Sequence, residues 1–258
     1  MQTVLFNSTI FGPIHSRRLG SSLGVNLSPS DGKICSFDCL YCEAGYNAQG
    51  PGTSGLPPRT EVARLLDEKL AAMRAAGEGL DVITFSGNGE PTIHPDFAGI
   101  IDDTIALRDK YFPQVKISVL TNSTMLGRPQ VVEALRKVDN NILKLDSAIE
   151  RTVQLLDRPN PSYRLPKVIE QLAQFGGSGI IQTMITRGSH DGEAVDNSTD
   201  EEIAALIEAY RRIMPRSIMI YSIDRRTPEQ SLQRVEKPEL EAIAARITEA
   251  TGIEVSVA

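Results

Sequence analysis

The chain has 258 residues, of which 41% are hydrophobic and 23% are charged, and its net charge is -6 at pH 7. This length suits one large domain or two small ones, and the composition is that of an ordinary globular protein. The net negative charge argues against a globally basic protein that binds nucleic acid. A local basic patch remains an alternative. We find no signal-peptide pattern and no stretch near the roughly 18 apolar residues of a membrane span. We therefore expect a cytoplasmic protein.

Strand and helix patterns alternate along the chain after a lead-in, residues 1–20, that is predicted to be a loop. Strands are predicted at 22–27, 81–86, 115–120, 141–145, 179–185 and 217–224, with a short final strand at 253–257. Helices are predicted at 61–76, 95–110, 129–138, 165–175, 199–214 and 238–251. Both Ser198-x-x-Glu201 and Thr199-x-x-Glu202 are typical of a capping box. Residues 188–197 are predicted to form a polar loop.

Six strand–helix units in succession indicate parallel strands joined by right-handed crossovers. Since six units are too few for the eight-stranded barrel, we predict an α/β fold of the open, curved (β/α)6 partial TIM-type barrel class. A flavodoxin-like or Rossmann sheet is the alternative. We expect residues 1–258 to form a single domain, with the functional residues at the carboxyl ends of the strands.

One face of the predicted strands is polar. A closed barrel is normally filled with Val, Ile and Leu, so this face predicts a lumen that holds solvent or ligand. The alternative is that polar residues merely gather near water at the strand ends. The buried lysine on this face, Lys144, would need a partner, which Asp146 or Glu90 could provide. The polar positions are Thr84, Ser86, Ser118, Asn122, Lys144, Asp146, Gln182, Thr186, Ser222 and Asp224.

All three cysteines follow the first predicted strand, at Cys35, Cys39 and Cys42, with the spacing C-x3-C-x2-C. Thiolates bind iron–sulfur clusters, zinc or copper(I), and their clustering here fits a reducing compartment. A cubane cluster takes one ligand per iron, so three thiolates would leave one iron open to a substrate. An apolar helix face is a weaker alternative. A closed zinc site needs four ligands, so it would have to recruit His15, His94 or His190.

The cysteine spacing resembles the signature of the radical S-adenosylmethionine (SAM) superfamily, C-x3-C-x-aromatic-C, with Tyr41 at the aromatic position. Other stretches resemble a core-domain-only subgroup near the tRNA wybutosine-synthesis enzymes: GPIHSRRLG at 12–20, SGNGEPT at 86–92, KLD at 144–146 and DRPN at 157–160. The resemblance implies a [4Fe-4S] cluster on Cys35, Cys39 and Cys42, with SAM on the fourth iron. One electron would then cleave SAM to methionine and a 5′-deoxyadenosyl radical, which abstracts hydrogen from an unidentified substrate.

The resemblance also assigns residues to SAM. Gly89 and Glu90 match the GGE motif, which holds the amino group of the methionine moiety, and Asn88 replaces its first glycine. Tyr41 would contact adenine, largely through its backbone. The ribose hydroxyls and the carboxylate would meet residues that follow the third and fourth predicted strands, namely Asn122, Asp146 and Ser147.

The sequence does not identify the electron donor or the substrate. An enzyme of this kind needs an electron donor such as flavodoxin or ferredoxin. Its substrate could be a small molecule, a protein side chain or an RNA base, with His190 as a candidate substrate contact, whereas His94 is predicted to be a helix-entry residue. An RNA base is suggested by the subgroup and by Arg17, Arg18, Arg158, Arg225 and Arg226. A non-catalytic metal-binding module of three cysteines and one histidine is a hypothesis of another class.

Overall fold

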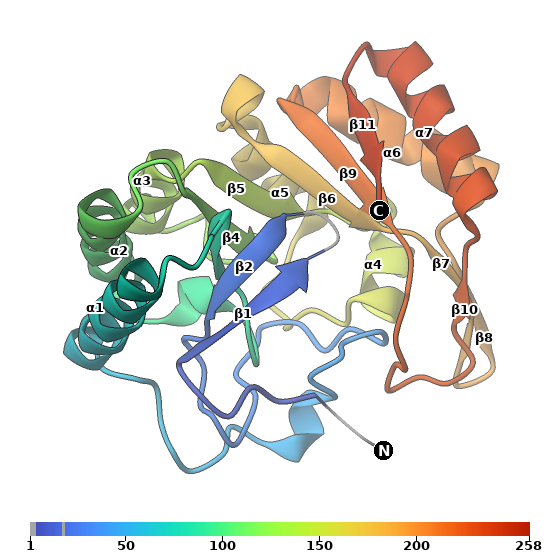
Figure 1. The fold of residues 1–258 in the computed structure, drawn as a ribbon. Helices are drawn as coiled ribbons and strands as arrows, with labels where there is room; N and C mark the ends of the chain where they lie inside the picture. The colour runs from blue at the N-terminus through green and yellow to red at the C-terminus, as the bar shows by residue number, and fades with distance from the viewer. Residues whose placement is uncertain (1–3, 17–18) are drawn as a thin grey trace.

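The structure is a computed structural model, and it describes residues 4–16 and 19–258. Arg17 and Arg18 lie outside the described residues. One sheet carries the fold, with the strand order β1-β2-β3-β4-β5-β6-β9-β11. From β2 to β11 each strand runs parallel to its neighbour, whereas β1 is antiparallel to β2. Figure 1 shows this sheet curving, with helices along its outer side. The partial-barrel prediction is confirmed.

The strands of the large sheet are β1 (Ile10–Ser16), β2 (Gly20–Val25), β3 (Val82–Phe85), β4 (Lys116–Thr121), β5 (Asn140–Lys144), β6 (Ile180–Met184), β9 (Ser217–Tyr221) and β11 (Val255–Val257). A second, three-stranded sheet has the order β10-β7-β8 and consists of β7 (Thr186–His190), β8 (Glu193–Asp196) and β10 (Gln233–Arg234).

The helices are α1 (Arg59–Ala76), α2 (Phe97–Tyr111), α3 (Pro129–Lys137), α4 (Glu150–Leu156), α5 (Leu165–Ala173), α6 (Asp200–Ile213) and α7 (Lys237–Thr251). Three short 3-10 turns are η1 (Asn47–Gln49), η2 (Pro91–Ile93) and η3 (Gly176–Ser178). Thr199 caps α6, because its hydroxyl accepts a hydrogen bond from Glu202 N at 3.3 Å. The Glu202 carboxylate bonds to Ser147 and Thr152 instead, so the reciprocal half of the predicted capping box is not formed. None of the helices in the described chain has the length and apolar character needed to cross a bilayer.

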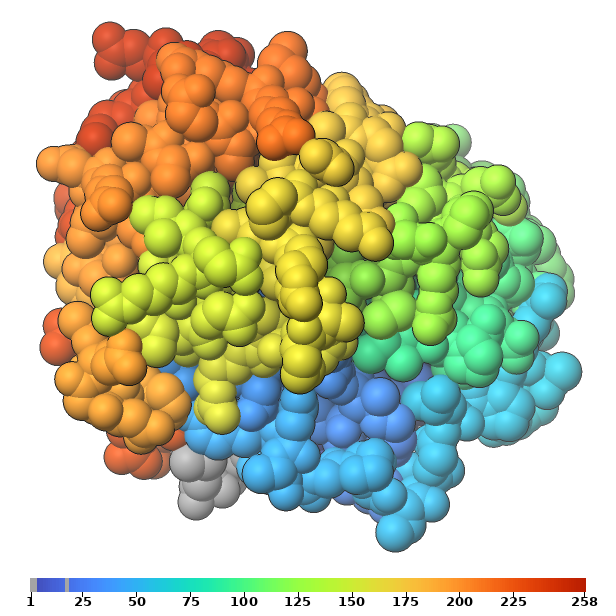
Figure 2. Space-filling model, turned by 180° about the vertical axis from the view of Figure 1, so that it is seen from behind, coloured from blue at the N-terminus to red at the C-terminus, as the bar shows by residue number. Residues whose placement is uncertain are grey.

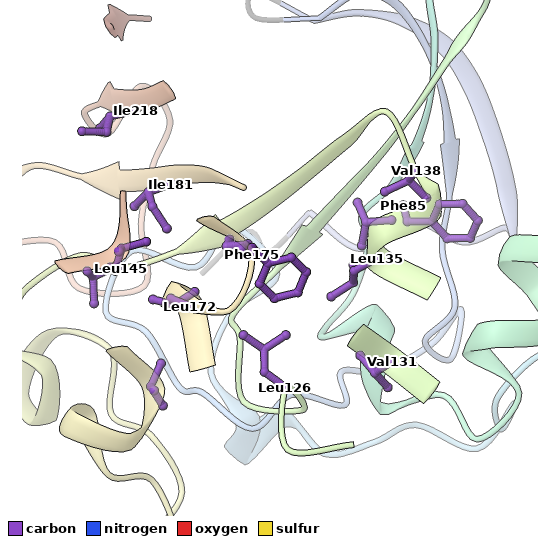
Figure 3. Close-up of a cluster of buried hydrophobic side chains, with 14 of the residues drawn as sticks. Phe85, Leu126, Val131, Leu135, Val138, Leu145, Leu172, Phe175, Ile181 and Ile218 are labelled. Carbon is purple, nitrogen blue, oxygen red and sulfur yellow. The ribbon is translucent and has the colours of Figure 1, made fainter. Parts of the chain in front are cut away.

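The core lies between the outer face of the sheet and the helices. Figure 3 shows Phe85, from the sheet, near the helix residue Leu135. It also shows Leu145 and Ile181 near Leu172, which belongs to another helix. These five side chains are between 0% and 5% exposed. Strand residues on this face alternate with inward-facing ones, as the period of two requires. The core therefore fixes which side chains point into the barrel.

Two predicted loops are wrong. The lead-in contains β1, whose Gly12 and Pro13 suggested a break; an edge strand tolerates Pro, and the register shifts there between Phe11 and Ile14. The predicted polar loop 188–197 is largely a hairpin of β7 and β8. Its turn is Asp191 and Gly192, both at positive φ (48° and 81°), the combination that a tight two-residue hairpin turn needs. Helix α4 was also missed.

Candidate cluster and cofactor site

The cysteine loop, defined here as residues 33–43, follows β2 and lies at the carboxyl ends of the parallel strands, where the sequence placed it. Cys35, Cys39 and Cys42 are free thiols, each partly buried. Burial raises the pKa of Cys35 to about 12 and that of Cys39 well above its usual range. Both are therefore neutral thiols at pH 7 without a metal, and metal binding must release their protons.

On one side, the loop pairs with the turn after β3. Ile34 N donates to Asn88 O at 3.2 Å, and Glu90 N donates to Ile34 O at 3.0 Å. Between them lies Gly89, where a Cβ atom would come within 1.9 Å of Ile34 O. Only glycine allows two backbones to approach so closely. Gly89 thus fixes the distance between the cysteine loop and β3.

On another side, the loop pairs with residues 156–160, which contain the DRPN stretch. Asp38 N donates to Asp157 O at 3.0 Å, Leu40 N to Leu156 O at 3.0 Å, and Asn160 N to Ser36 O at 2.9 Å. Figure 2 shows the yellow-green residues around α4 directly against the blue N-terminal part of the chain. Backbone bonds from two distant segments therefore shape the loop before any cofactor binds.

The third support comes from inside the N-terminal region and was not predicted. The amide of Asn47 donates to Phe37 O at 3.0 Å and to Cys35 O at 3.4 Å, and Asn47 N donates to Asp38 Oδ1 at 2.6 Å. The ammonium group of Lys33, which is 4% exposed, donates to Gly45 O at 2.7 Å. No local sequence pattern marks either residue, since both bonds depend on how the loop folds back.

Asn88 supports the loop rather than facing a ligand. Its Oδ1 accepts from Phe6 N at 2.8 Å, and its Nδ2 donates to Phe6 O at 2.8 Å and to Pro29 O at 2.9 Å. The residue is fully buried. Both polar atoms of its side chain bond within the protein, which leaves one acceptor position, on Oδ1, for the SAM contact predicted for it.

Glu90 connects the ends of β3 and β4. Its Oε1 accepts from Thr92 N at 3.0 Å and from the Thr121 hydroxyl at 2.7 Å. Among the described residues, its Oε2 accepts one hydrogen bond, from Asn122 N at 2.6 Å. Burial raises the pKa of Glu90, and these hydrogen bonds partly offset the effect. A nearby ammonium group would further stabilise the charged form, and Oε2 has acceptor capacity left for one.

Asn122 contacts the first cysteine. Its Nδ2 donates to Ser36 Oγ at 2.9 Å and lies 3.5 Å from Cys35 Sγ, while its Oδ1 accepts from the Thr124 hydroxyl at 2.7 Å. Sequence position suggested a ribose contact, but the structure brings this amide to the cysteine loop.

Lys144 is the centre of a buried charge cluster. Its ammonium group pairs with Asp146 and, at 3.1 Å, with Asp157 Oδ1, and it lies 4.6 Å from the centre of the Tyr41 ring. The Tyr41 hydroxyl also donates to Asp146. The predicted pairing of Lys144 with Asp146 is confirmed; Glu90 is not its partner, and Asp157 was missed.

The charges of this cluster depend on one another. Burial alone lowers the pKa of Lys144, but Asp146 and Asp157 outweigh it and raise that pKa well above its usual value. Burial raises the pKa of Asp157 to about 7, although Lys144 opposes the shift. Asp157 Oδ1 also lies 3.6 Å from Cys39 Sγ. The cluster thus joins the end of β5 to the cysteine loop.

Ser147 does not reach this site. Its hydroxyl donates to Glu202 of α6 at 2.6 Å and accepts from Ile149 N at 2.9 Å, and the residue is fully buried. It therefore links the end of β5 to the helix layer. Asp146, one residue earlier, does face the cluster, but its Oδ1 already accepts from Met184 N at 3.0 Å.

A cavity of about 490 Å³ extends from the cysteine loop into the barrel, within the size range of small-molecule sites. Cys42 and Gly87 line its upper part, and Thr84, Ser86 and Gln182 line its walls. A lumen is therefore present, although apolar residues, among them Leu120, Ile142 and Met219, also line it. Ser118, Thr186 and Ser222 instead form hydrogen bonds within the protein.

A second cavity, of about 840 Å³, lies at the amino ends of the strands. Asp81, Lys116 and Glu254 are among the residues that line it. Leu19, Ile142 and Met219 line both cavities.

His94 and His190 form hydrogen bonds away from the cysteine loop. His94 Nε2 lies 2.9 Å from Pro57 O, and its Nδ1 accepts from Asp96 N, which confirms a helix-entry role. His190 Nδ1 lies 2.6 Å from Glu229 Oε2. In the described part of the chain, no three His, Cys, Asp or Glu side chains converge on a point that one metal ion could occupy. This arrangement disfavours a mononuclear zinc site, whereas a cubane spreads its ligands over separate irons.

Among curated proteins, a UPF0026 protein of Methanocaldococcus jannaschii is 32% identical over 181 residues, which cover 68% of this chain and 53% of that protein. The chain spans 35% to 64% of the length of five curated relatives that it matches.

Among solved structures, a radical SAM methyltransferase from Sphaerobacter thermophilus matches 92% of this chain and 65% of its own, with a TM-score of 0.66 and 17% identity. An archaeal TYW1 matches 91% of this chain and 74% of its own, with a TM-score of 0.51 and 12% identity. At these identities, both similarities concern the fold. The family model of the radical SAM superfamily matches residues 30–196, from the cysteine loop to the end of β8. The chain therefore belongs to the radical SAM superfamily.

Proposed function

We propose that this protein is a radical SAM enzyme in which Cys35, Cys39 and Cys42 hold the cluster. The cofactors of the superfamily are a [4Fe-4S] cluster and SAM. Bound together, they supply one-electron cleavage of SAM to methionine and a 5′-deoxyadenosyl radical that abstracts hydrogen from a substrate. The observation that supports the proposal best is a cysteine loop held in shape on three sides, with Cys42 lining a cavity in the barrel.

The residues present suit both groups. Three soft thiols on one loop provide three of the four ligands that a cubane needs. Glu90 Oε2, with a single donor in the structure, would receive the amino group of SAM, and Gly89 would keep the loop close to it. Tyr41, held by Asp146, would present its backbone to adenine, and Asp146 and Asn122 would approach the ribose side. The apolar outer layer and the buried strand ends would exclude water.

The electron donor and the substrate are further parts of the proposal. A flavodoxin or ferredoxin would supply the electron. An RNA base of the wybutosine type is supported by the subgroup resemblance, but two of the arginines that suggested it are paired with carboxylates. Arg225 pairs with Glu43 at 2.6 Å, and Arg158 lies 3.4 Å from Asp38. Phosphate binding would appear as RNA affinity that falls steeply with salt.

Anaerobic reconstitution with iron and sulfide tests the central claim. The protein should bind about four irons per chain, and dithionite with SAM should give 5′-deoxyadenosine and methionine, measured by mass spectrometry. Cys35→Ser, Cys39→Ser and Cys42→Ser should each remove both signals, whereas Ser30→Ala, on the loop before the cysteines, should keep them. Protein that holds one zinc and no iron, or that holds a cluster but leaves SAM intact, would refute the proposal and favour the metal-binding module.

A further inference from the structure

Gln182, in the middle of β6, points into the barrel and lines the cavity below the cysteine loop. It is 8% exposed. Its backbone carbonyl accepts a hydrogen bond from Leu145 N at 3.0 Å. Its side-chain carboxamide makes no hydrogen bond to any residue in the described part of the chain.

Other buried amides in the chain form side-chain hydrogen bonds within the protein, namely those of Asn26, Asn88, Asn122, Asn141 and Asn197. Asn141 Oδ1 is nevertheless buried without a partner, whereas the amide of Gln182 is not sealed off in this way and opens onto the cavity. Its hydrogen-bonding capacity is therefore directed at the cavity and is available to a molecule that enters it.

The charged groups around Gln182 already have partners. Across the sheet, Gln182 is level with Lys144 and Met219. The charge of Lys144 is balanced by Asp146 and Asp157. At the cavity, Arg225 pairs with Glu43 at 2.6 Å and Asp224 with Arg234 at 3.1 Å. Each of these charged side chains therefore has a partner of opposite sign within the protein.

The wall beside Gln182 is apolar. Leu120, Ile142 and Met219 line the same cavity. A flat or apolar body would pack against these side chains, and the methionine thioether favours contact with aromatic rings. A carboxamide donates and accepts side by side, so it can form two hydrogen bonds with a group that offers the complementary pair.

We propose that Gln182 is a substrate-recognition residue and that the substrate carries, inside the lumen, an uncharged group with a donor beside an acceptor. A carboxamide or a lactam on a flat ring has this chemistry. The inference rests on the proposed function, because it takes the lumen to be the substrate site of a radical SAM enzyme. It assigns Gln182 to binding and orientation.

Binding of small probes to the cluster-free full chain tests the inference. Nicotinamide and 2-pyridone carry the uncharged pair, and nicotinate, of the same size, carries a negative charge. By saturation-transfer NMR titration, the two uncharged probes should bind and nicotinate should not. Gln182→Leu should weaken nicotinamide binding at least about tenfold, the loss of roughly one good hydrogen-bonded pair. Gln114→Leu, a matched change at the other end of the barrel, should leave it unaltered.

Each opposite outcome overturns the inference: no binding of either uncharged probe, stronger binding of nicotinate, or equal binding by Gln182→Leu. The 5′-deoxyadenosine assay on the unaltered enzyme keeps the two proposals apart. SAM cleavage without probe binding refutes only the role of Gln182. Probe binding by a protein that holds a cluster and never cleaves SAM refutes the proposed function.

Discussion

The cysteine loop and the lumen wall treat their polar groups in opposite ways. Around the loop, backbone and side-chain groups bond to three other parts of the protein, through Gly89, Asp157 and Asn47. In the lumen, one buried carboxamide, that of Gln182, has no protein partner within the described chain. The hydrogen bonds of the cysteine loop are therefore made within the protein, whereas the lumen wall keeps a donor and an acceptor that a bound molecule can use.

This difference separates two demands on one site. A cluster needs its ligands held in place in advance, because a loosely held loop would lose affinity to the entropy of ordering. A substrate needs unsatisfied groups that it can complete on binding. Variants can test whether the two regions really differ in this way.

Gly89→Ala should have the largest effect. A methyl group 1.9 Å from Ile34 O must push the cysteine loop away from β3, because the obstructing atom is backbone. We expect the reconstituted variant to lose most of its iron, as measured by iron assay and EPR. Gly79→Ala, where nothing lies within 4 Å of the added atom, should load normally. Full loading of Gly89→Ala would show that the loop does not need this close approach.

Lys144→Met should have the second-largest effect, on the stability of the protein. It leaves Asp146 and Asp157 as neighbouring buried carboxylates without a cation, which costs about 3–5 kcal/mol in comparable cases. Urea denaturation of the cluster-free protein at pH 8 measures the free energy of unfolding. Lys137→Met removes an exposed pair with Asp102 and should cost less than about 1 kcal/mol. An equal loss of unfolding free energy in the two variants would mean that the buried cluster stabilises the protein no more than an exposed ion pair does.

Gln182→Leu, unlike Lys144→Met, should make the ligand-free protein more stable. Replacing an unpaired buried carboxamide by an apolar group should raise the free energy of unfolding of the ligand-free protein by about 1 kcal/mol. Asn88→Leu, which removes three hydrogen bonds at a fully buried residue, should lower it by more than that amount. Destabilisation by Gln182→Leu would indicate a partner for the amide in the free protein.

The smallest effect concerns Glu202, away from both regions. Burial raises the pKa of its carboxyl above the ordinary value of 4.5, and hydrogen bonds from Ser147 and Thr152 partly offset this shift. The folded state then keeps its proton to higher pH than the unfolded state, so stability falls as pH rises above 4.5. Glu202→Gln should flatten this fall, by about 1 kcal/mol or less.

Denaturation curves across pH 5 to 8 measure the effect of Glu202→Gln. Glu249→Gln, at an exposed position on α7, should keep the slope of the unaltered protein. A steeper fall in Glu202→Gln would mean that the hydrogen bonds outweigh burial.

Local patterns in the sequence were enough for much of this architecture. The strand–helix alternation predicted the parallel sheet, and the cysteine spacing predicted where the site lies. The hairpin at Asp191-Gly192 could also have been found, because its turn chemistry is local. The pairing of residues 156–160 with the cysteine loop could not, since more than 110 residues separate Asp38 from Asp157 and neither segment has a strand pattern. For the same reason Asn88 and Asn122 were assigned to SAM before their partners were visible.

The two cavities that share Leu19, Ile142 and Met219 as lining residues have a kinetic consequence. Movement of these three side chains would connect the cavities, and a molecule could then enter from the amino ends of the strands without passing the cysteine loop. Two reactants would then bind in either order. Initial-rate plots that intersect whichever reactant is varied, with no product that competes purely with one reactant, would be the steady-state sign of this second entrance.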